Sequence, residues 1–200
     1  MVTKVLSEML CMEKTTLFLV RHGEAEHNIL DVASSYPEHR AYHLTEEGRR
    51  QVAARAEELS HESVDVVFFS PLTRTRETAI VIAEKTGAPL FEDMRLREPG
   101  YGSFEGGSWS ALVAKYPPPE RRLKTDGTDG VENFGSVRER LVSFRDFVLS
   151  QYAGKHIVVV SHGDTLQLLH GILVGLTLEE SVLSEKRCRF RRGEMVKVDV

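Results

Sequence analysis

Short apolar runs that do not alternate with polar residues constrain the fold of this chain more than any other feature. TLFLV at residues 16–20 and IVVV at residues 157–160 are almost entirely apolar, as expected of strands that are covered on both faces. Segments with helical periodicity lie between such runs, and this alternation is typical of an α/β fold. We therefore expect a three-layer α/β/α fold with a mostly parallel sheet and one antiparallel edge strand.

Local signals place six strands and four helices along the chain. The expected strands span residues 15–20, 64–69, 89–92, 157–160, 187–190 and 195–198. Thr45 is a natural N-cap for a helix through about Leu59, and a second helix is expected over residues 73–85. A capping box of Ser136 and Glu139 predicts the start of a third helix. A fourth helix is expected from Gly163 to about residue 174.

Composition excludes several classes of function. The 200 residues are 41% hydrophobic and 28% charged with a net charge of −4, so nothing indicates a nucleic-acid partner, which usually requires a basic face. The apolar runs are far too short to cross a bilayer. Two cysteines, Cys11 and Cys188, make no disulfide framework, and we therefore expect a reducing, cytoplasmic compartment.

The chain divides into a short leader and one domain. Residues 1–14 carry apolar residues at helical spacing but neither the apolar core of a signal peptide nor the arginines of a transit peptide. We expect residues 15–200 to form a single domain, with the leader either docked on it as a helix or frayed. Residues 117–135 are rich in proline and glycine, and we interpret this connection as a lid over the site.

Two histidines occupy equivalent positions at the ends of predicted strands. His22 follows TLFLV and Arg21, and His162 follows HIVVVS. The carboxyl ends of strands are where ligands bind in open α/β sheets. The glycine after each histidine, Gly23 or Gly163, allows the backbone to turn sharply and to approach a bound group. Free backbone N–H groups at a helix start would attract an anion there.

Five short motifs follow one another in an order that is specific as a set. They are Arg21-His22-Gly23-Glu24 with Asn28, Leu44-Thr45-Glu46-Glu47-Gly48, Ser70-Pro71-Leu72-Thr73-Arg74-Thr75 with Thr78-Ala79, Leu96-Arg97-Glu98 followed by Gly102 and Glu105-Gly106, and Ser161-His162-Gly163. From residue 15 to about residue 175 the chain resembles the histidine phosphatase superfamily, the phosphoglycerate-mutase-like family. The resemblance implies that family's fold and phosphotransfer on a small phosphorylated substrate or a phosphoprotein, without a metal or a cofactor.

The chemistry of phosphoryl transfer gives each matched residue a role. It requires positioning and positive charge around the phosphoryl oxygens. A neutral imidazole of His22 can attack phosphorus and form a covalent intermediate. Arg21 and Arg74 offer planar forks that bind phosphate oxygens in pairs. His162 supplies a second imidazole that stabilises the transferring group. Glu98 can protonate the leaving oxygen and then deprotonate the attacking water.

Other acidic residues compete with Glu98 for the acid role. Glu105 and Asp164 are the rivals, and in another branch of the superfamily the acid is an aspartate directly after the second histidine. Here Gly163 intervenes, which favours Glu98. Asn28 is predicted to contact phosphate, with capping of a helix or turn as the alternative.

The position of Arg74 near a predicted helix start favours function. The helix dipole disfavours a cation there, and a bound anion would remove that conflict. Arg76 and Arg97 have no such argument, and we expect them to form surface salt bridges.

Two further clusters are interpreted as structural. The pattern H-x-E-x-x-H at His22, Glu24 and His27 lacks the spacing of the histidine pair on a zinc helix. The basic run at residues 186–192 alternates, so Cys188 and Phe190 would face inward from a half-buried strand while the arginines face solvent.

The same chemistry serves more than one function. Water can hydrolyse the phosphohistidine, as in a phosphatase, or a bound sugar acid can accept the phosphoryl group, as in a mutase. Residues 29–43 lack the glycine-rich, tryptophan-bearing stretch that is common in the family's mutases, which favours a phosphatase. The third reading is a non-catalytic module that binds a phosphorylated ligand.

Overall fold

The described part of the protein is built around a five-stranded sheet with strand order β3-β2-β4-β1-β5. The computed structural model describes residues 14–116, 123, 125 and 127–200. Four strands run parallel to their neighbours, and β5 pairs antiparallel with β1 at one edge. The predicted α/β sheet with an antiparallel edge strand is thus confirmed. The strands are β1 (Thr16–Arg21), β2 (Val66–Phe69), β3 (Leu90–Glu92), β4 (His156–Ser161) and β5 (Met195–Asp199).

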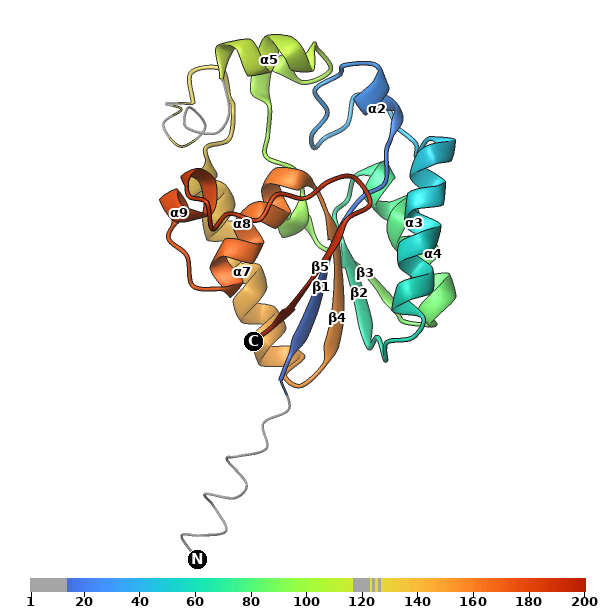
Figure 1. The fold of residues 1–200 in the computed structure, drawn as a ribbon. Coiled ribbons are helices and arrows are strands. Elements are labelled where there is room, and N and C mark those ends of the chain that lie inside the picture. The colour runs from blue at the N-terminus through green and yellow to red at the C-terminus, as the bar shows by residue number, and fades with distance from the viewer. Residues whose placement is uncertain (1–13, 117–122, 124, 126) are drawn as a thin grey trace, which may run out of the picture.

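Helices cover both faces of the sheet. Helices α3 (Glu46–Leu59) and α4 (Thr73–Thr86) pack on one face, and α7 (Phe134–Gln151), α8 (Gly163–Leu173) and α9 (Leu178–Leu183) lie on the other (Figure 1). Alternate residues of β1 enter the two cores, with Leu17 and Leu19 on the α7 side and Phe18 and Val20 on the α4 side. This two-sided burial explains why the strand sequences do not alternate.

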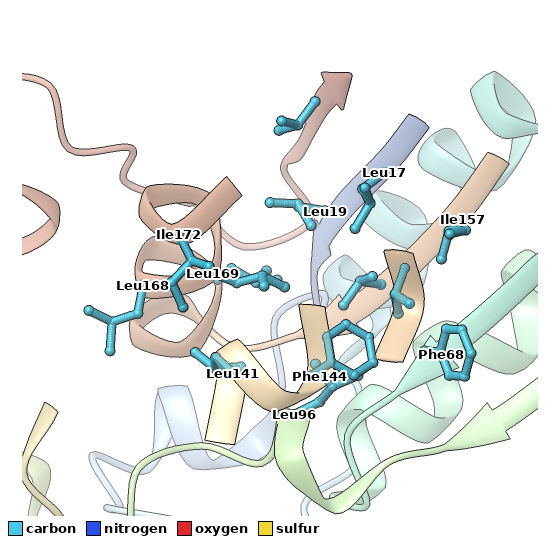
Figure 2. Packing of buried hydrophobic residues seen from close by; sticks show 14 of the residues in the cluster. Leu17, Leu19, Phe68, Leu96, Leu141, Phe144, Ile157, Leu168, Leu169 and Ile172 are labelled. Carbon is cyan, nitrogen blue, oxygen red and sulfur yellow. The ribbon is translucent and has the colours of Figure 1, made fainter. Parts of the chain in front are cut away.

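The core under α7 and α8 is aromatic and aliphatic. Figure 2 shows Phe144 and Leu141 of α7 facing the sheet, with Leu168 and Leu169 of α8 beside them. The rings of Phe68 and Phe144 meet edge to face, with centroids 5.6 Å apart, a geometry that aromatic pairs favour. Dense packing of this kind fixes β1, β2 and β4 relative to one another, and therefore fixes what projects from their ends.

Three short helices were not predicted from the sequence. Helices α2 (Glu26–Ile29) and α5 (Trp109–Lys115) lie above the carboxyl ends of the strands, as Figure 1 shows, and α9 follows α8. Two 3₁₀ turns, Met94–Leu96 and Gly102–Phe104, also belong to this end of the molecule. The described helices include none long and apolar enough to span a membrane.

The predicted helix ends are confirmed at some positions and corrected at another. Thr45 caps α3 by accepting a hydrogen bond from Gly48 N at 3.0 Å. The third predicted helix starts earlier than expected, because Asn133, not Ser136, is the N-cap of α7. The Asn133 side chain accepts from Ser136 N at 2.9 Å, and the extra turn buries Phe134.

The predicted strand at residues 187–190 is wrong. This segment contains no ladder, since the free edge of β1 is already occupied by β5. The prediction that Cys188 and Phe190 face inward nevertheless holds, because Phe190 is buried and Cys188 packs against the same core. The predicted leader, apart from Lys14, lies outside the described residues. So do residues 117–122, 124 and 126 of the predicted lid, whose last two residues belong to α7.

Candidate active site

The two strand-end histidines meet at the carboxyl end of the sheet. Arg21 of β1 lies in register with Ser161 of β4, so the residues that follow these two project from the same edge. His22 N continues the ladder by donating to Ser161 O at 3.1 Å. The His22 and His162 rings are 5.3 Å apart between centroids, and the residues are 2% and 1% exposed. Parallel pairing of β1 and β4 therefore assembles the predicted pair.

The imidazole of His22 is oriented for attack by its Nε2 atom. Its Nδ1 lies 2.7 Å from Gly23 O, and a carbonyl can only accept, so Nδ1 carries the proton and Nε2 keeps its lone pair. Arg74 Nε lies 3.3 Å from this Nε2. Burial, followed by the charges of Arg74 and Arg21, holds the pKa of His22 well below its usual value. The ring is thus neutral, as a nucleophile must be.

Arg74, in the first turn of α4, is buried and has a carboxylate partner. Its Nη1 donates to Glu38 Oε1 at 3.1 Å and its Nη2 to Ser34 O at 2.9 Å. Glu38 also accepts from Thr73 N at 2.9 Å and therefore caps the helix whose Leu72 N-cap makes no side-chain bond. The expected conflict with the helix dipole is thus relieved by a protein carboxylate, without requiring a bound anion. No local pattern links residues 38 and 74, so sequence reasoning missed Glu38.

Arg21 connects the site to the C-terminal segment. Its Nη1 donates to Phe190 O at 2.8 Å, and its Nε is buried without a hydrogen-bond partner among the described residues. Burial lowers the pKa of Arg21, while the charges of Glu98 and Asp164 oppose this shift. A guanidinium remains charged at neutral pH under these conditions, so Arg21 contributes a fixed positive charge.

The glycines beside the histidines serve packing as well as turning. A Cβ atom on Gly163 would lie 3.2 Å from Arg21 Cζ, so this glycine makes room for the guanidinium. A Cβ atom on Gly23 would lie 2.4 Å from Gly48 O, which means that this glycine lets the β1 end approach α3. Gly163 lies beside the predicted phosphate-binding arginine, whereas Gly23 is required for contact between two segments of backbone.

Glu98 lies beside the second histidine. Its Oε2 is 4.0 Å from His162 Nδ1, and its Oε1 accepts from Tyr101 OH at 2.9 Å. On the other side of the ring, His162 Nε2 is 2.7 Å from Ser70 Oγ. Burial and the charge of Arg74 hold the pKa of His162 well below its usual value. The carboxyl group and the two neutral imidazoles thus share one buried space.

The rival acids occupy other places. Glu105 is engaged by Ser35, whose N and Oγ both donate to Glu105 Oε2, at 2.8 and 2.5 Å. Asp164 lies in the first turn of α8 and lines a neighbouring pocket. The expected salt bridges of Arg76 and Arg97 are present: Arg76 pairs with Glu92 at the surface, and Arg97 pairs with the partly buried Glu132.

Asn28 and His27 form a polar pair at the rim. Asn28 Oδ1 accepts from Ala25 N at 3.1 Å, so the capping alternative is present in the structure. Asn28 Nδ2 lies 2.8 Å from His27 Nε2. Burial, with the charges of Arg74 and Arg21, lowers the pKa of His27 to about 2. His27 is a third neutral imidazole of the site that sequence reasoning did not assign.

The H-x-E-x-x-H cluster does not converge on one point. The rings of His22 and His27 are 5.7 Å apart, whereas the Glu24 carboxylate accepts from Thr45 Oγ1 at 2.9 Å. Among the residues that the structure describes, no three His, Cys, Asp or Glu side chains are arranged to hold a metal ion.

These side chains enclose a cavity of about 150 Å³. Eight residues were predicted from the sequence to be catalytic or to bind substrate, and six of them line this cavity. The other two, Gly23 and Gly163, lie directly beside His22 and His162 in the chain. Arginines outnumber acids around it, and a phosphate group would be attracted into such a cavity. The lining consists of Arg21, His22, His27, Asn28, Asp31, Val32, Ser34, Arg74, Glu98, Tyr101, Trp109, His162 and Arg192.

A neutral buried imidazole that shares a cavity with two arginines at the end of a parallel sheet is an arrangement suited to binding phosphate. The chain belongs to the histidine phosphatase superfamily (branch 1), whose family model matches residues 17–184. It is therefore an enzyme of that superfamily.

Relatives carry both phosphatase and mutase names. Phosphoserine phosphatase 1 of Hydrogenobacter thermophilus is 32% identical over 168 residues, covering 82% of this chain and 78% of the relative. The probable phosphoglycerate mutase GpmB of Serratia proteamaculans is 30% identical over 194 residues, covering 92% and 84%. The crystal structure of the alpha-ribazole phosphatase from Shigella flexneri is similar at a TM-score of 0.74 and 25% identity, covering 92% of this chain and 90% of that one.

Buried neutral imidazoles predict a loss of stability in mild acid. The pKa of each of His22, His27 and His162 is lowered in the folded protein, first by burial, and returns to about 6.5 on unfolding. Below about pH 6.5 the unfolded chain therefore binds more protons, and the free energy of unfolding falls as pH falls. Replacing His27 by Phe should flatten this dependence by about one proton, or ~1.4 kcal/mol per pH unit.

Urea unfolding between pH 5.0 and 7.5 measures this slope. The difference between the wild type and His27→Phe cancels the contribution of all other groups. His61→Phe is the matched control, because the His61 side chain is 78% exposed. Equal slopes in all three proteins would show that His27 is not held neutral in the folded state.

Because the Arg74–Glu38 pair is buried, we expect its loss to destabilise the protein more than the loss of an exposed ion pair. Glu38→Ala should lower the free energy of unfolding by about 3–5 kcal/mol, because it leaves the buried charge of Arg74 without its ion-pair partner. Glu92→Ala, which breaks the exposed pair with Arg76, should cost at most about 1 kcal/mol. Urea unfolding compares the two. Arg74→Met introduced into Glu38→Ala should recover part of the loss, and no recovery would contradict the loss of this ion pair as the cause.

Proposed function

We propose that this chain is a metal-independent phosphatase that hydrolyses phosphate monoesters through a phosphohistidine on His22. One observation carries the proposal: His22 presents a neutral Nε2 lone pair inside a cavity that also contains Arg21, Arg74, His162 and Glu98. The cavity thus combines the groups that phosphoryl transfer requires: a nucleophile, positive charges that bind phosphate, and a nearby carboxyl group.

In the first step the phosphoryl group moves from the ester to His22. Nε2 attacks phosphorus while the bond from phosphorus to the ester oxygen breaks, and Glu98 gives its proton to that oxygen. Arg21 and Arg74 bind the phosphoryl oxygens, whose negative charge they match. The Nδ1–H bond to Gly23 O, 2.7 Å long, stabilises the positive charge that the ring acquires.

In the second step water releases the phosphate. Glu98, now a carboxylate, removes a proton from water as its oxygen attacks phosphorus, and the bond from phosphorus to Nε2 breaks. The histidine returns to its neutral form and Glu98 is protonated again, so the cycle closes. The Tyr101 hydroxyl, 2.9 Å from Glu98 Oε1, keeps the carboxyl group facing the cavity.

Several features support a phosphatase that acts on small esters. A cavity of about 150 Å³ has room for a phosphoryl group. The curated relatives include a phosphoserine phosphatase and a probable phosphoglycerate mutase, and mutase activity is the alternative. The free thiol of Cys188 fits the cytoplasm, which we propose as the compartment.

Hydrolysis of p-nitrophenyl phosphate in EDTA tests the proposal directly. His22→Ala should lower kcat by at least about three orders of magnitude, because no covalent intermediate can form. An acid-labile phosphate should be trapped on the wild type by rapid quenching and mapped to His22 by mass spectrometry. His61→Ala, which removes an exposed histidine, should change neither result.

Each other outcome has a distinct meaning. A near-normal rate in His22→Ala would overturn the mechanism. Trapped phosphohistidine with little hydrolysis, together with transfer between phosphoglycerates, would identify a mutase. Tight binding of a phosphate analogue such as vanadate without any turnover would identify a binding module.

The acid role of Glu98 makes a separate prediction. Glu98→Gln should slow glycerol phosphate, whose leaving group needs a proton, by about 100-fold or more, and p-nitrophenyl phosphate by much less. Steady-state kcat/KM for the two esters measures the difference. Glu105→Gln, which disturbs only the bonds to Ser35, should affect both esters alike. Equal slowing of both esters in Glu98→Gln would assign the acid to another group.

A further inference from the structure

A second pocket adjoins the catalytic cavity. Its volume is about 240 Å³, and it shares Arg21 and Trp109 with the catalytic cavity. Most of its other walls come from the first turns of α8 and from the segment between α9 and β5, which crosses α8 in Figure 1. The two pockets are therefore neighbours, and an ester with its phosphoryl group in the catalytic cavity could extend its organic part into the second pocket.

The second pocket is basic. Arg187 and Arg189 line it together with Arg21, against one acid, Asp164. Arg187 uses one nitrogen, Nη1, to donate to the carbonyls of Val182 and Leu183, which leaves other N–H groups of its fork. Arg189 is exposed and makes no hydrogen bond or ion pair within the described part of the chain. The positive end of α8 also faces this pocket, because Gly163 lines it.

The remaining walls suit a short carbon skeleton. Phe134, Val182, Phe190 and Trp109 contribute apolar surface, and Gln167 is held by its bond to Ser181 O at 2.9 Å. Small-molecule sites typically combine such surface with a few placed polar groups. Phe190 O accepts a hydrogen bond from Arg21 Nη1, so the segment that carries Arg187 and Arg189 is anchored at Phe190 to the catalytic arginine.

We propose that this pocket, here called the arginine pocket (Arg21, Trp109, Gln167, Arg187, Arg189 and Phe190), binds a second anionic group in the organic part of the ester. The substrate is then a phosphate monoester that also carries a carboxylate or a second phosphate, the groups that guanidinium forks match. The inference rests on the proposed function of His22, because the ester must place its phosphoryl group in the catalytic cavity.

Matched pairs of esters test the proposal. O-phosphoserine and phosphoethanolamine differ only by a carboxylate, as do 3-phosphoglycerate and ethylene glycol monophosphate. Fructose 1,6-bisphosphate and fructose 6-phosphate differ by one phosphate. This pair therefore shows whether the second anionic group is a phosphate and not a carboxylate. We expect kcat/KM to be higher by about tenfold or more for the anionic member of at least one pair, as one charged hydrogen bond implies.

Two variants test whether the preference for the more anionic ester arises in the arginine pocket. Arg189→Gln should reduce the ratio within the preferred pair to about threefold or less, because one charged fork is lost. Arg191→Gln is the matched control, since Arg191 is exposed two residues away and lines a different surface. It should leave the ratio unchanged. A ratio that both variants leave intact would overturn the arginine pocket.

Binding separates this proposal from the proposed function. Titration calorimetry on His22→Ala, without turnover, should give the same order of affinities for each pair. Selective binding with no hydrolysis by the wild type would reject the phosphatase and keep the arginine pocket. Hydrolysis with equal kcat/KM and equal affinity within all pairs would reject the arginine pocket and keep the phosphatase.

Discussion

The parallel pairing of β1 with β4 is the interaction on which the rest of the molecule depends. It places the residues after Arg21 and Ser161 at one edge, and so brings two imidazoles to a centroid distance of 5.3 Å. The register is maintained because both faces of these strands are buried, and a slip by one residue would turn every side chain toward the wrong core. Helices on both sides of the sheet thus serve the site indirectly, by leaving these strands no alternative alignment.

Burial has opposite consequences for the histidines and for the arginines of the site. It removes the proton from His22 and His162, whose pKa values fall far below those of exposed imidazoles. It cannot remove the charge of Arg74, whose pKa is lowered by burial from a much higher starting value. Glu38 partly compensates that charge. The site therefore combines neutral nitrogen with fixed positive charge, which is what a nucleophile for a phosphate anion needs.

The sequence predicted all five strands of the sheet from local patterns, and the residues at its carboxyl edge from local patterns together with the resemblance of their motifs to those of a family. Apolar runs predicted the strands, and the motifs that follow them predicted Arg21, His22, Arg74, Glu98 and His162.

Contacts between distant segments were not predictable. Glu38 lies in an irregular loop, and its bond to Arg74 exists only once that loop folds over α4. Residues 187–190 alternate like a strand, but β5 competes for the same edge of β1. At α7, Asn133 and Ser136 are both good caps, and burial of Phe134 decides between them.

The contacts around His22 also set the order in which the molecule can be completed. Gly193 N donates to His22 O at 3.0 Å and Arg21 N donates to Glu194 O at 3.0 Å, while Phe190 O holds the guanidinium of Arg21. Residues near the start of the domain are thus held by residues that are synthesised much later, as with Arg21 and Phe190, which are 169 positions apart. A nascent chain can assemble most of its sheet and still lack these supports. The catalytic site is consequently complete only once residues 190–194 have been synthesised and have packed against the end of β1.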